Sequence, residues 1–150
     1  MNISITIAGP DEYTLVIQLL KALYQELGEE SSSVSFLSED LIATLTSKSQ
    51  TSVYLMRSGP EVIGIITITE SQAIYAGGKY GVIDEMYVIP SHRGREAGKQ
   101  MIDFVSKKAI EHGWKRVDVT APTEARWERT RRFYEENGFV FTGPKYKLER

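Results

Sequence analysis

The chain has 150 residues, the usual size of a domain with its own hydrophobic core, so we expect a single domain over residues 1–150. Its 41% hydrophobic and 25% charged residues are ordinary, and a net charge of -2 gives no global attraction for nucleic acid or an anionic membrane. The absence of cysteine excludes disulfides, thiolate metal sites and a cysteine nucleophile, and with two histidines we expect no metal site.

The N-terminal residues carry no basic leader, and nowhere do eighteen apolar residues run together, so we expect a cytoplasmic protein without a membrane partner. Residues 3–8 alternate and are rich in β-branched types, which predicts a strand ended by Gly9-Pro10. Asp11 is expected to cap a helix that continues to Gly28, because leucines recur at four-residue steps.

A short helix and a hairpin are predicted next. Ser38, followed by two acidic residues, is expected to begin a helix that ends near Ser47. Residues 52–57 and 61–69 predict two strands, and the turn residues 58–60 between them indicate an antiparallel hairpin.

An acidic strand follows this hairpin. Residues 70–79 predict an irregular connection, and residues 80–90 predict a strand ended by Pro90. Asp84 and Glu85 lie in the middle of this apolar strand. Two carboxylates in such a place are costly unless they are used, so we expect a functional role for the pair.

The last part of the chain alternates helices and strands. A helix over 96–113, a strand over 115–121 and a helix over 124–138 are predicted, followed by short strands over 139–143 and 146–149. Because a hairpin is combined with crossover helices, the sheet should contain antiparallel and parallel pairs. The expected fold class is α/β with a mixed sheet and helices on its faces.

The junction between the acidic strand and the next helix, SHRGREAGKQM, has the composition of a phosphate-binding loop. A Walker loop is excluded because Gly94 and Gly98 have three residues between them and Lys99 is followed by glutamine. A dinucleotide-binding fingerprint is excluded by the glycine spacing and by the position in the chain.

The stretch RGREAG, Arg93 to Gly98, resembles the acetyl-CoA-binding motif Q/R-x-x-G-x-G/A of the GNAT N-acetyltransferases. DEMYVIP before it and FYEENGF, Phe133 to Phe139, are also similar to phrases of that family. The order of elements agrees over essentially the whole chain. The resemblance implies the GNAT fold, with a central mixed sheet flanked by about four helices.

The resemblance implies an acetyl-CoA-dependent transfer of an acetyl group to a primary amine, by direct attack in a ternary complex. The end of the acidic strand would pair with the pantetheine arm, and the backbone N–H groups at the start of the next helix would hold the pyrophosphate. Arg93, Arg95 and Lys99 would add charge-assisted contacts. The residues implied to bind the cofactor are Met86, Tyr87, Val88, Arg93, Gly94, Arg95, Glu96, Ala97, Gly98, Lys99 and Trp127.

Two of these residues depart from the family pattern. Glu96 stands where the family most often has glycine; on a first helical turn its side chain would either extend into solvent or oppose the phosphates. Trp127 stands where many members have an asparagine that contacts pantetheine, and its contact would be made by packing.

Three residues are candidates for the chemistry. Neighbouring strand residues project to opposite faces, so ordinarily only one of Asp84 and Glu85 should line the cleft. We favour Glu85 as the base or as the anchor of the amine. Asp84 is the second candidate, because a bulge in this strand would upset the alternation. Tyr134 matches the family tyrosine that donates a proton to the departing thiolate, and a backbone N–H of Tyr87 or Val88 would meet the oxyanion.

The partner expected for this chain is a small-molecule or peptidic amine. Tyr24 and residues 29–33 and 75–79 would wall the acceptor pocket by family analogy, and a homodimer is possible. The arginines of residues 126–132 are balanced by glutamates, so no nucleic-acid partner is expected. A non-catalytic acetyl-CoA sensor and an interaction domain that has lost the cofactor are the alternatives.

Overall fold

The computed structural model describes residues 2–28, 31–94 and 96–150. Its contacts cluster in two compact units, Met1–Asp118 and Val119–Arg150, which are described separately. A single functional domain over the whole chain stays a prediction. No helix in the described ranges is long and apolar enough to cross a bilayer.

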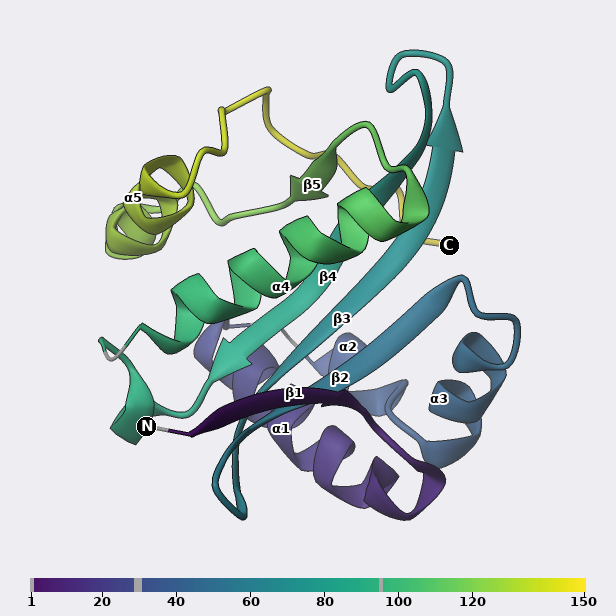
Figure 1. Cartoon of the computed structure of the whole chain (residues 1–150), viewed down its shortest axis with the longest axis vertical. Helices are drawn as coiled ribbons and strands as arrows, with labels where there is room; N and C mark the ends of the chain where they lie inside the picture. The colour runs from purple at the N-terminus through teal and green to yellow at the C-terminus, as the bar shows by residue number, and fades with distance from the viewer. Residues whose placement is uncertain (1, 29–30, 95) are drawn as a thin grey trace. The chain divides into compact units, whose positions relative to one another are not determined.

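The first unit is built on a twisted sheet (Figure 1). The strands of the sheet, in spatial order, are β1 (Ile3–Ile7), β2 (Thr51–Ser58), β3 (Glu61–Ala73), β4 (Gly78–Val88) and β5 (Val117–Val119), the last of which ends just past the boundary of this unit. The first four pair antiparallel. Lys115 N donates to Lys79 O and Gly81 N donates to Arg116 O, both at 3.0 Å. Along these two hydrogen bonds the residue numbers increase in the same direction on β4 and on the segment that leads into β5, which is the pattern of a parallel pair. The predicted mixed sheet is therefore confirmed.

The first helix begins differently from the prediction. Gly9 N donates to Glu12 Oε1 at 3.0 Å, which closes a 3-10 turn, η1 (Pro10–Glu12), ahead of α1 (Tyr13–Glu26). Asp11 lies inside this turn and is not the cap, because the N-terminal hydrogen bond is made by the carboxylate of the next residue. Of the predicted apolar stripe, Val16, Leu19, Leu20 and Leu23 are buried, whereas Leu15 is only half-buried.

Two short helices connect α1 to the sheet. α2 (Ser31–Ser35) was not predicted, and α3 (Glu39–Thr46) was. Ser38 Oγ accepts a hydrogen bond from Leu41 N at 3.0 Å, so the predicted cap is confirmed.

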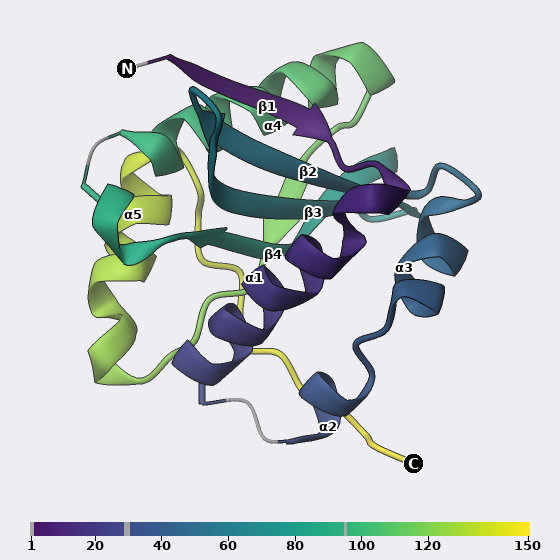
Figure 2. The ribbon, with the colours of Figure 1, turned by 90° about the horizontal axis from the view of Figure 1, so that it is seen from below.

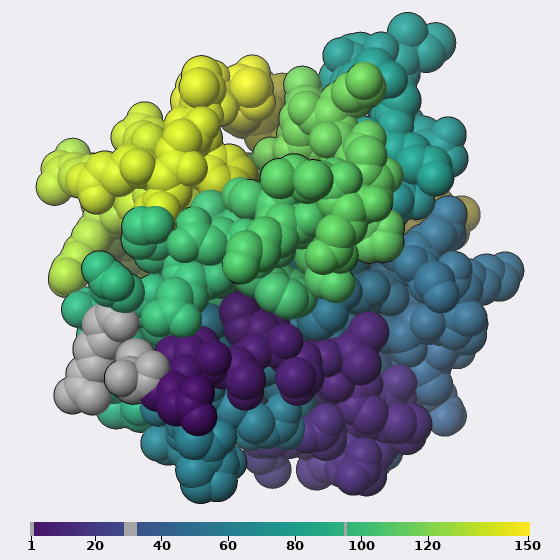
Figure 3. Space-filling view, viewed as in Figure 1, coloured from purple at the N-terminus to yellow at the C-terminus, as the bar shows by residue number. Residues whose placement is uncertain are grey.

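Helices α1 and α4 (Ala97–His112) cover opposite faces of the sheet (Figure 2). On the α1 face, Val16 and Leu20 pack in a core with Leu55 and Ile65. Figure 3 shows the outer surface of α4 beside that of β1. α4 ends at Gly113, whose φ is 70°, in agreement with the predicted helix over 96–113.

Close contact with the sheet fixes the position of α4. A Cβ on Gly64 of β3 would lie 2.7 Å from Met101 Cε and 2.7 Å from the backbone oxygen of Tyr87. Only glycine fits there without displacing the backbone.

The irregular connection predicted over residues 70–79 is instead mostly strand. β3 and β4 continue pairing as far as Ala73 and Gly78, so the turn is confined to residues 74–77. The polar residues of this stretch remain in strands because the ladder supplies partners for their backbone groups.

The second unit holds a 3-10 turn, η3 (Ala125–Trp127), and α5 (Glu128–Glu136), within the predicted helix over 124–138. The strands predicted over 139–143 and 146–149 are wrong: neither is present in the described part of this unit. Their large apolar side chains, Val140, Phe141, Tyr146 and Leu148, are 66–94% exposed. An alternating pattern becomes a strand only when a neighbouring strand takes up its backbone groups.

Candidate active site

A β-bulge in β4 determines where its two carboxylates lie. Thr67 of β3 is opposite Glu85, but the next residue, Ile68, is opposite Ile83, so Asp84 is the extra residue. Thr67 and Ile68 project to opposite faces, and cross-strand partners share a face. Glu85 therefore lies on the α1 face, whereas Ile83 lies on the α4 face.

Glu85 is held by side chains from two different elements. Tyr24 of α1 donates from its hydroxyl to Glu85 Oε2 at 2.9 Å, and Thr67 Oγ1 donates to Glu85 Oε1. Glu85 N donates in turn to Thr67 Oγ1 at 2.9 Å. Burial raises the pKa of Glu85; the hydrogen bonds from Thr67 and Tyr24 lower it, and the charge of Asp84 raises it. The balance is a carboxyl that gains a proton more readily than usual.

Asp84 reaches the same face as Glu85. Its Oδ2 accepts a hydrogen bond from Thr69 Oγ1 at 2.5 Å, and Thr69 is two residues beyond Thr67 in β3. The regular alternation, which would have placed only one of the two acids on this face, does not hold here, because the bulge for which the sequence analysis allowed brings both acids to it. Asp84 is exposed, whereas Glu85 is partly buried.

The end of β4 offers its backbone to an extended ligand. Ile89 N donates to Ile63 O at 2.9 Å, and strand backbone groups alternate in direction, so those of Tyr87 face β3 and those of Met86 and Val88 face the β5 edge. Tyr87 N is thus directed away from this edge. Of the two residues expected to meet an oxyanion, only Val88 has its N–H directed to this edge.

The loop before α4 contains two residues in left-handed conformations. Gly94 has φ 74°, and Glu96, the N-cap of α4, has φ 67° and ψ 5°. The placement of Glu96 on a first helical turn is therefore wrong: the helix begins at Ala97, and the residue before it must turn the chain. This conformation explains why glycine suits the position. Arg95 lies outside the described residues.

Arg93 and Lys99, the two described cations of this region, have partners within the protein. Arg93 donates from Nε to Val88 O at 2.8 Å and from Nη2 to Glu26 Oε2 at 2.7 Å, and its guanidinium lies 5.3 Å from the centre of the Tyr87 ring. Lys99 Nζ is 3.3 Å from Asp103 Oδ2 in an exposed pair. The Val88 carbonyl on the open edge is thus occupied by Arg93.

The remaining candidates belong to the second unit. The Tyr134 ring makes edge contacts with Phe133 and Phe139, with centroids 5.4 and 5.5 Å apart, and burial raises its pKa to about 12. Trp127 Nε1 is buried and has no hydrogen-bond partner among the described residues. A buried donor of this kind is uncommon in a protein without a bound ligand.

Sequence reasoning missed Thr67 and Thr69, which hold the two carboxylates. Both interrupt the isoleucines of β3 at a two-residue spacing, and this spacing was the available signal. Tyr24, expected as a pocket wall, contacts Glu85 directly. Of the other expected walls, Tyr75 lies on the β3–β4 turn with its hydroxyl 3.1 Å from that of Tyr80, and residues 29 and 30 lie outside the described ranges.

Comparison with known proteins identifies the class. The model of the acetyltransferase (GNAT) family matches residues 16–139. This match spans most of the chain, so the protein belongs to the GNAT family, as its motifs suggested, and acyl transfer is the general chemistry of that family. No curated protein matches the sequence.

Solved structures share the fold. An aminoglycoside acetyltransferase from an uncultured soil metagenomic sample superposes with a TM-score of 0.83 at 15% identity, over 100% of this chain and 99% of that chain. A ribosomal-protein-alanine N-acetyltransferase from Brucella melitensis gives 0.74 at 21% identity, over 99% and 100%. A predicted acetyltransferase with acetyl-CoA from Clostridium acetobutylicum gives 0.81 at 18% identity, over 99% and 96%.

Proposed function

We propose that the protein is an acetyl-CoA-dependent N-acetyltransferase that acetylates a primary amine, small or peptidic, by direct attack in a ternary complex. The observation that carries the proposal is the pair of carboxylates that the bulge directs to the α1 face, with Glu85 held by Tyr24 and Thr67. Family membership supports the transfer of an acyl group; the acceptor and the cofactor are the proposal.

Glu85 is assigned the role of base. An alkyl ammonium group with a pKa of about 10.4 cannot attack a thioester until it loses a proton. A carboxylate within reach, directly or through water, can accept that proton. Tyr24 and Thr67 fix the orientation of Glu85, because each donates to a different carboxylate oxygen. Asp84, exposed on the same face, supplies a second negative charge that attracts the cationic acceptor.

Each unit, taken by itself, has groups that suit a coenzyme A ester. Trp127 Nε1 is a buried donor that lacks an acceptor among the described residues, and a pantetheine amide has carbonyl oxygens to offer it. On this edge of β4, the backbone groups of Met86 and the N–H of Val88 suit an extended chain, as in strand addition, whereas the Val88 carbonyl is bonded to Arg93. The N-terminus of α4, with Arg93 and Lys99 nearby, would hold the pyrophosphate. When bound, acetyl-CoA supplies the acetyl thioester.

Tyr134 is assigned the role of proton donor to the departing thiolate. A phenol can serve as an acid only while it keeps its proton, and burial raises the pKa of Tyr134 to about 12. The hydroxyl therefore carries its proton throughout the neutral range. The N–H of Val88 faces the open edge and is the backbone donor available to an oxyanion.

The test is release of free thiol from acetyl-CoA in the presence of a panel of amines. We expect turnover with at least one amine and a loss of about a hundredfold or more in Glu85→Gln. Glu39→Gln, an exposed residue of α3, is the matched control and should keep full activity. Heat of acetyl-CoA binding without thiol release from any amine would contradict acyl transfer and support a sensor. No heat at all would contradict both.

A further inference from the structure

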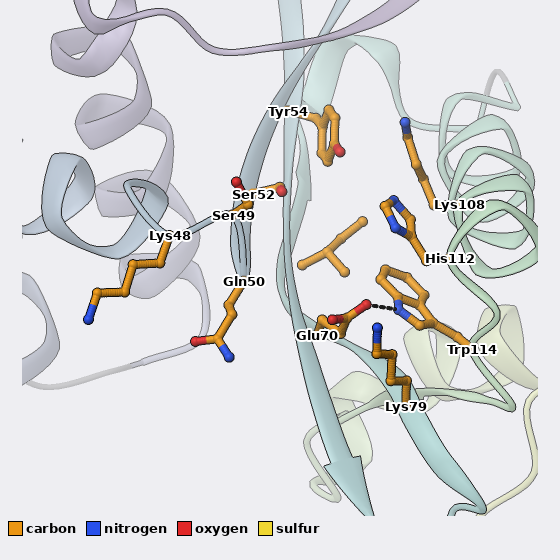
Figure 4. Close-up of a pocket in the computed structure, with 11 residues that line it drawn as sticks. Lys48, Ser49, Gln50, Ser52, Tyr54, Glu70, Lys79, Lys108, His112 and Trp114 are labelled. Atoms are coloured by element: carbon orange, nitrogen blue, oxygen red, sulfur yellow. Dashed lines mark hydrogen bonds between the residues drawn. The ribbon is translucent and has the colours of Figure 1, made fainter.

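A pocket on the α4 face of the sheet has no role in the chemistry proposed above. It has a volume of about 300 Å³, at the lower end of the range for small-molecule sites (Figure 4). Its floor is Ile68, which is 3% exposed, and its walls come from the α3–β2 turn, three strands and the end of α4. The lining residues that carry the argument are Tyr54, Ile68, Glu70, Lys79, Lys108 and Trp114.

The pocket is separated from the carboxylate pair by the sheet itself. Ile68 and Glu70 are neighbours of Thr67 and Thr69 in β3, and successive strand residues point to opposite faces. Glu85 and Asp84 bond to the two threonines, so they lie on the other side. A ligand in the pocket would not occupy the proposed acceptor site.

One aromatic wall is held rigid. Trp114 Nε1 donates to Glu70 Oε1 at 2.7 Å, and the indole is stacked on His112 with ring centres 5.3 Å apart and planes 19° apart. The indole lies against Gly81, where a Cβ would be 2.5 Å from the ring. The orientation of Trp114 is therefore set by the protein itself, through its contact with Gly81, its hydrogen bond to Glu70 and its stacking on His112.

The opposite wall combines an aromatic ring with a cation. Tyr54 makes an edge contact with Phe104, their centres 4.8 Å apart, and Lys108 Nζ lies 5.7 Å from the Tyr54 ring centre and 5.4 Å from that of Phe104. In Figure 4, the amine of Lys79 points up toward the Glu70–Trp114 pair, whereas Lys48 extends away from the pocket centre.

The charges lining the pocket favour an anion. Glu70 is the one carboxylate among the lining residues, and its Oε1 is taken by Trp114. Lys79 and Lys108 lie around the cavity and Lys48 lies at its rim, and Lys108 Nζ is also 3.4 Å from Glu111 Oε2, a carboxylate outside the lining. This local excess of positive charge occurs in a chain whose net charge is -2. Amines beside an apolar floor attract a ligand that combines a negative group with an apolar body.

We propose that this pocket binds a small aromatic anion: a single ring bearing a carboxylate or a phosphate. The ring would lie over Ile68 between Tyr54 and Trp114, gaining from burial and from aromatic contact. The anionic group would lie between Lys79 and Lys108, with the hydroxyl of Ser52 as a further donor. The site is distinct from the one that carries acyl transfer.

The chain contains two tryptophans, which give a direct test by nuclear magnetic resonance of the indole N–H groups. Phenyl phosphate is the probe, and Trp114→Phe assigns the two signals. We expect saturable shifts of the Trp114 signal with little change at Trp127, and no displacement of the probe by excess coenzyme A. Phenol and inorganic phosphate should each bind at least about tenfold more weakly, because each lacks one half of the ligand.

A charge-matched pair of double variants completes the test. Lys79→Gln with Lys108→Gln should weaken phenyl phosphate binding about tenfold or more, whereas Lys21→Gln with Lys145→Gln, two exposed lysines elsewhere, should leave it unchanged. Equal binding of phenol and phenyl phosphate, shifts confined to Trp127, or unchanged affinity in the first double variant would each overturn the proposal. An unchanged amide spectrum of each variant establishes that it is folded.

Discussion

The surroundings of Glu85 have opposing effects on the pKa of its carboxyl group. Burial raises its pKa and Asp84 adds in the same direction, while the hydrogen bonds from Thr67 and Tyr24 lower it. The proposed base must be ionised to accept a proton, so these two donors would widen the pH range in which Glu85 could act in that role. The threonine and the tyrosine are therefore positioning residues whose contribution is visible in a pH profile.

We expect Thr67→Val and Tyr24→Phe each to move the acidic limb of the kcat/KM profile to higher pH. Each substitution removes a hydrogen bond that lowers the pKa of Glu85. A move of one pH unit corresponds to about 1.4 kcal/mol. Tyr13→Phe is the matched control, because the Tyr13 hydroxyl in the same helix meets Thr46 at 3.3 Å. An unmoved limb in both variants would show that Glu85 is not the base.

The backbone conformation of Glu96 destabilises the folded protein. Its φ of 67° places a side chain in the left-handed region, which costs a non-glycine residue about 1–2 kcal/mol. We expect Glu96→Gly to raise the free energy of unfolding by about 1 kcal/mol, because glycine adopts this conformation readily. Urea denaturation measures the change.

Glu96→Ala separates backbone strain from charge at this position. Alanine removes the carboxylate but keeps Cβ, so it should not stabilise the protein as glycine does. If both variants are stabilised equally, charge and not backbone conformation is responsible. A gain in acetyl-CoA affinity with both variants would further indicate that the carboxylate opposes the phosphates.

At the scale of elements, one additional residue in β4 gives two adjacent acids a common face. A regular strand would separate them, and the position of the bulge follows from pairing with β3. Elsewhere β3 must come close to α4 and to the neighbouring strand. Gly64 permits this approach, since its missing Cβ leaves the space in which Met101 and the Tyr87 carbonyl lie.

We expect Gly64→Ala to destabilise the protein by about 2 kcal/mol, within the usual cost of overpacking. The new Cβ would lie 2.7 Å from the Tyr87 carbonyl oxygen, a backbone atom that cannot turn aside as a side chain can. Chemical denaturation measures the loss. Gly64→Ala combined with Met101→Ala tests the cause: the double variant should not recover stability, and full recovery would attribute the strain to the methionine alone.

At the scale of the whole molecule, sequence patterns predicted the elements whose boundaries are local. The leucine stripe of α1, the Ser38 cap of α3 and the glycine that ends α4 all depend on neighbours a few residues away. The predictions were wrong where the presence of a neighbouring strand determines whether a segment is extended. β3 continues to Ala73, beyond its predicted end, and the strands expected from Phe139 onward are not present among the described residues. The bulge allowed for in the acidic strand is present, but its exact position, which gives Asp84 and Glu85 a shared face, could not be predicted because register is a property of two strands.

In the proposed reaction, the pH dependence would be set by the pKa values of Tyr134 as acid and Glu85 as base, both of which are raised. Burial raises the pKa of Tyr134 to about 12, so the phenol keeps its proton and the rate should rise with pH with no fall below about pH 11. Tyr134→Phe should lower kcat by about a hundredfold and leave acetyl-CoA binding unchanged. Tyr146→Phe, an exposed tyrosine of the same unit, is the control. The contrary result would be a wild-type rate that falls near pH 10, with no such fall in Tyr134→Phe. Tyr134 would then lose its proton near pH 10, and burial would not keep its hydroxyl protonated as proposed.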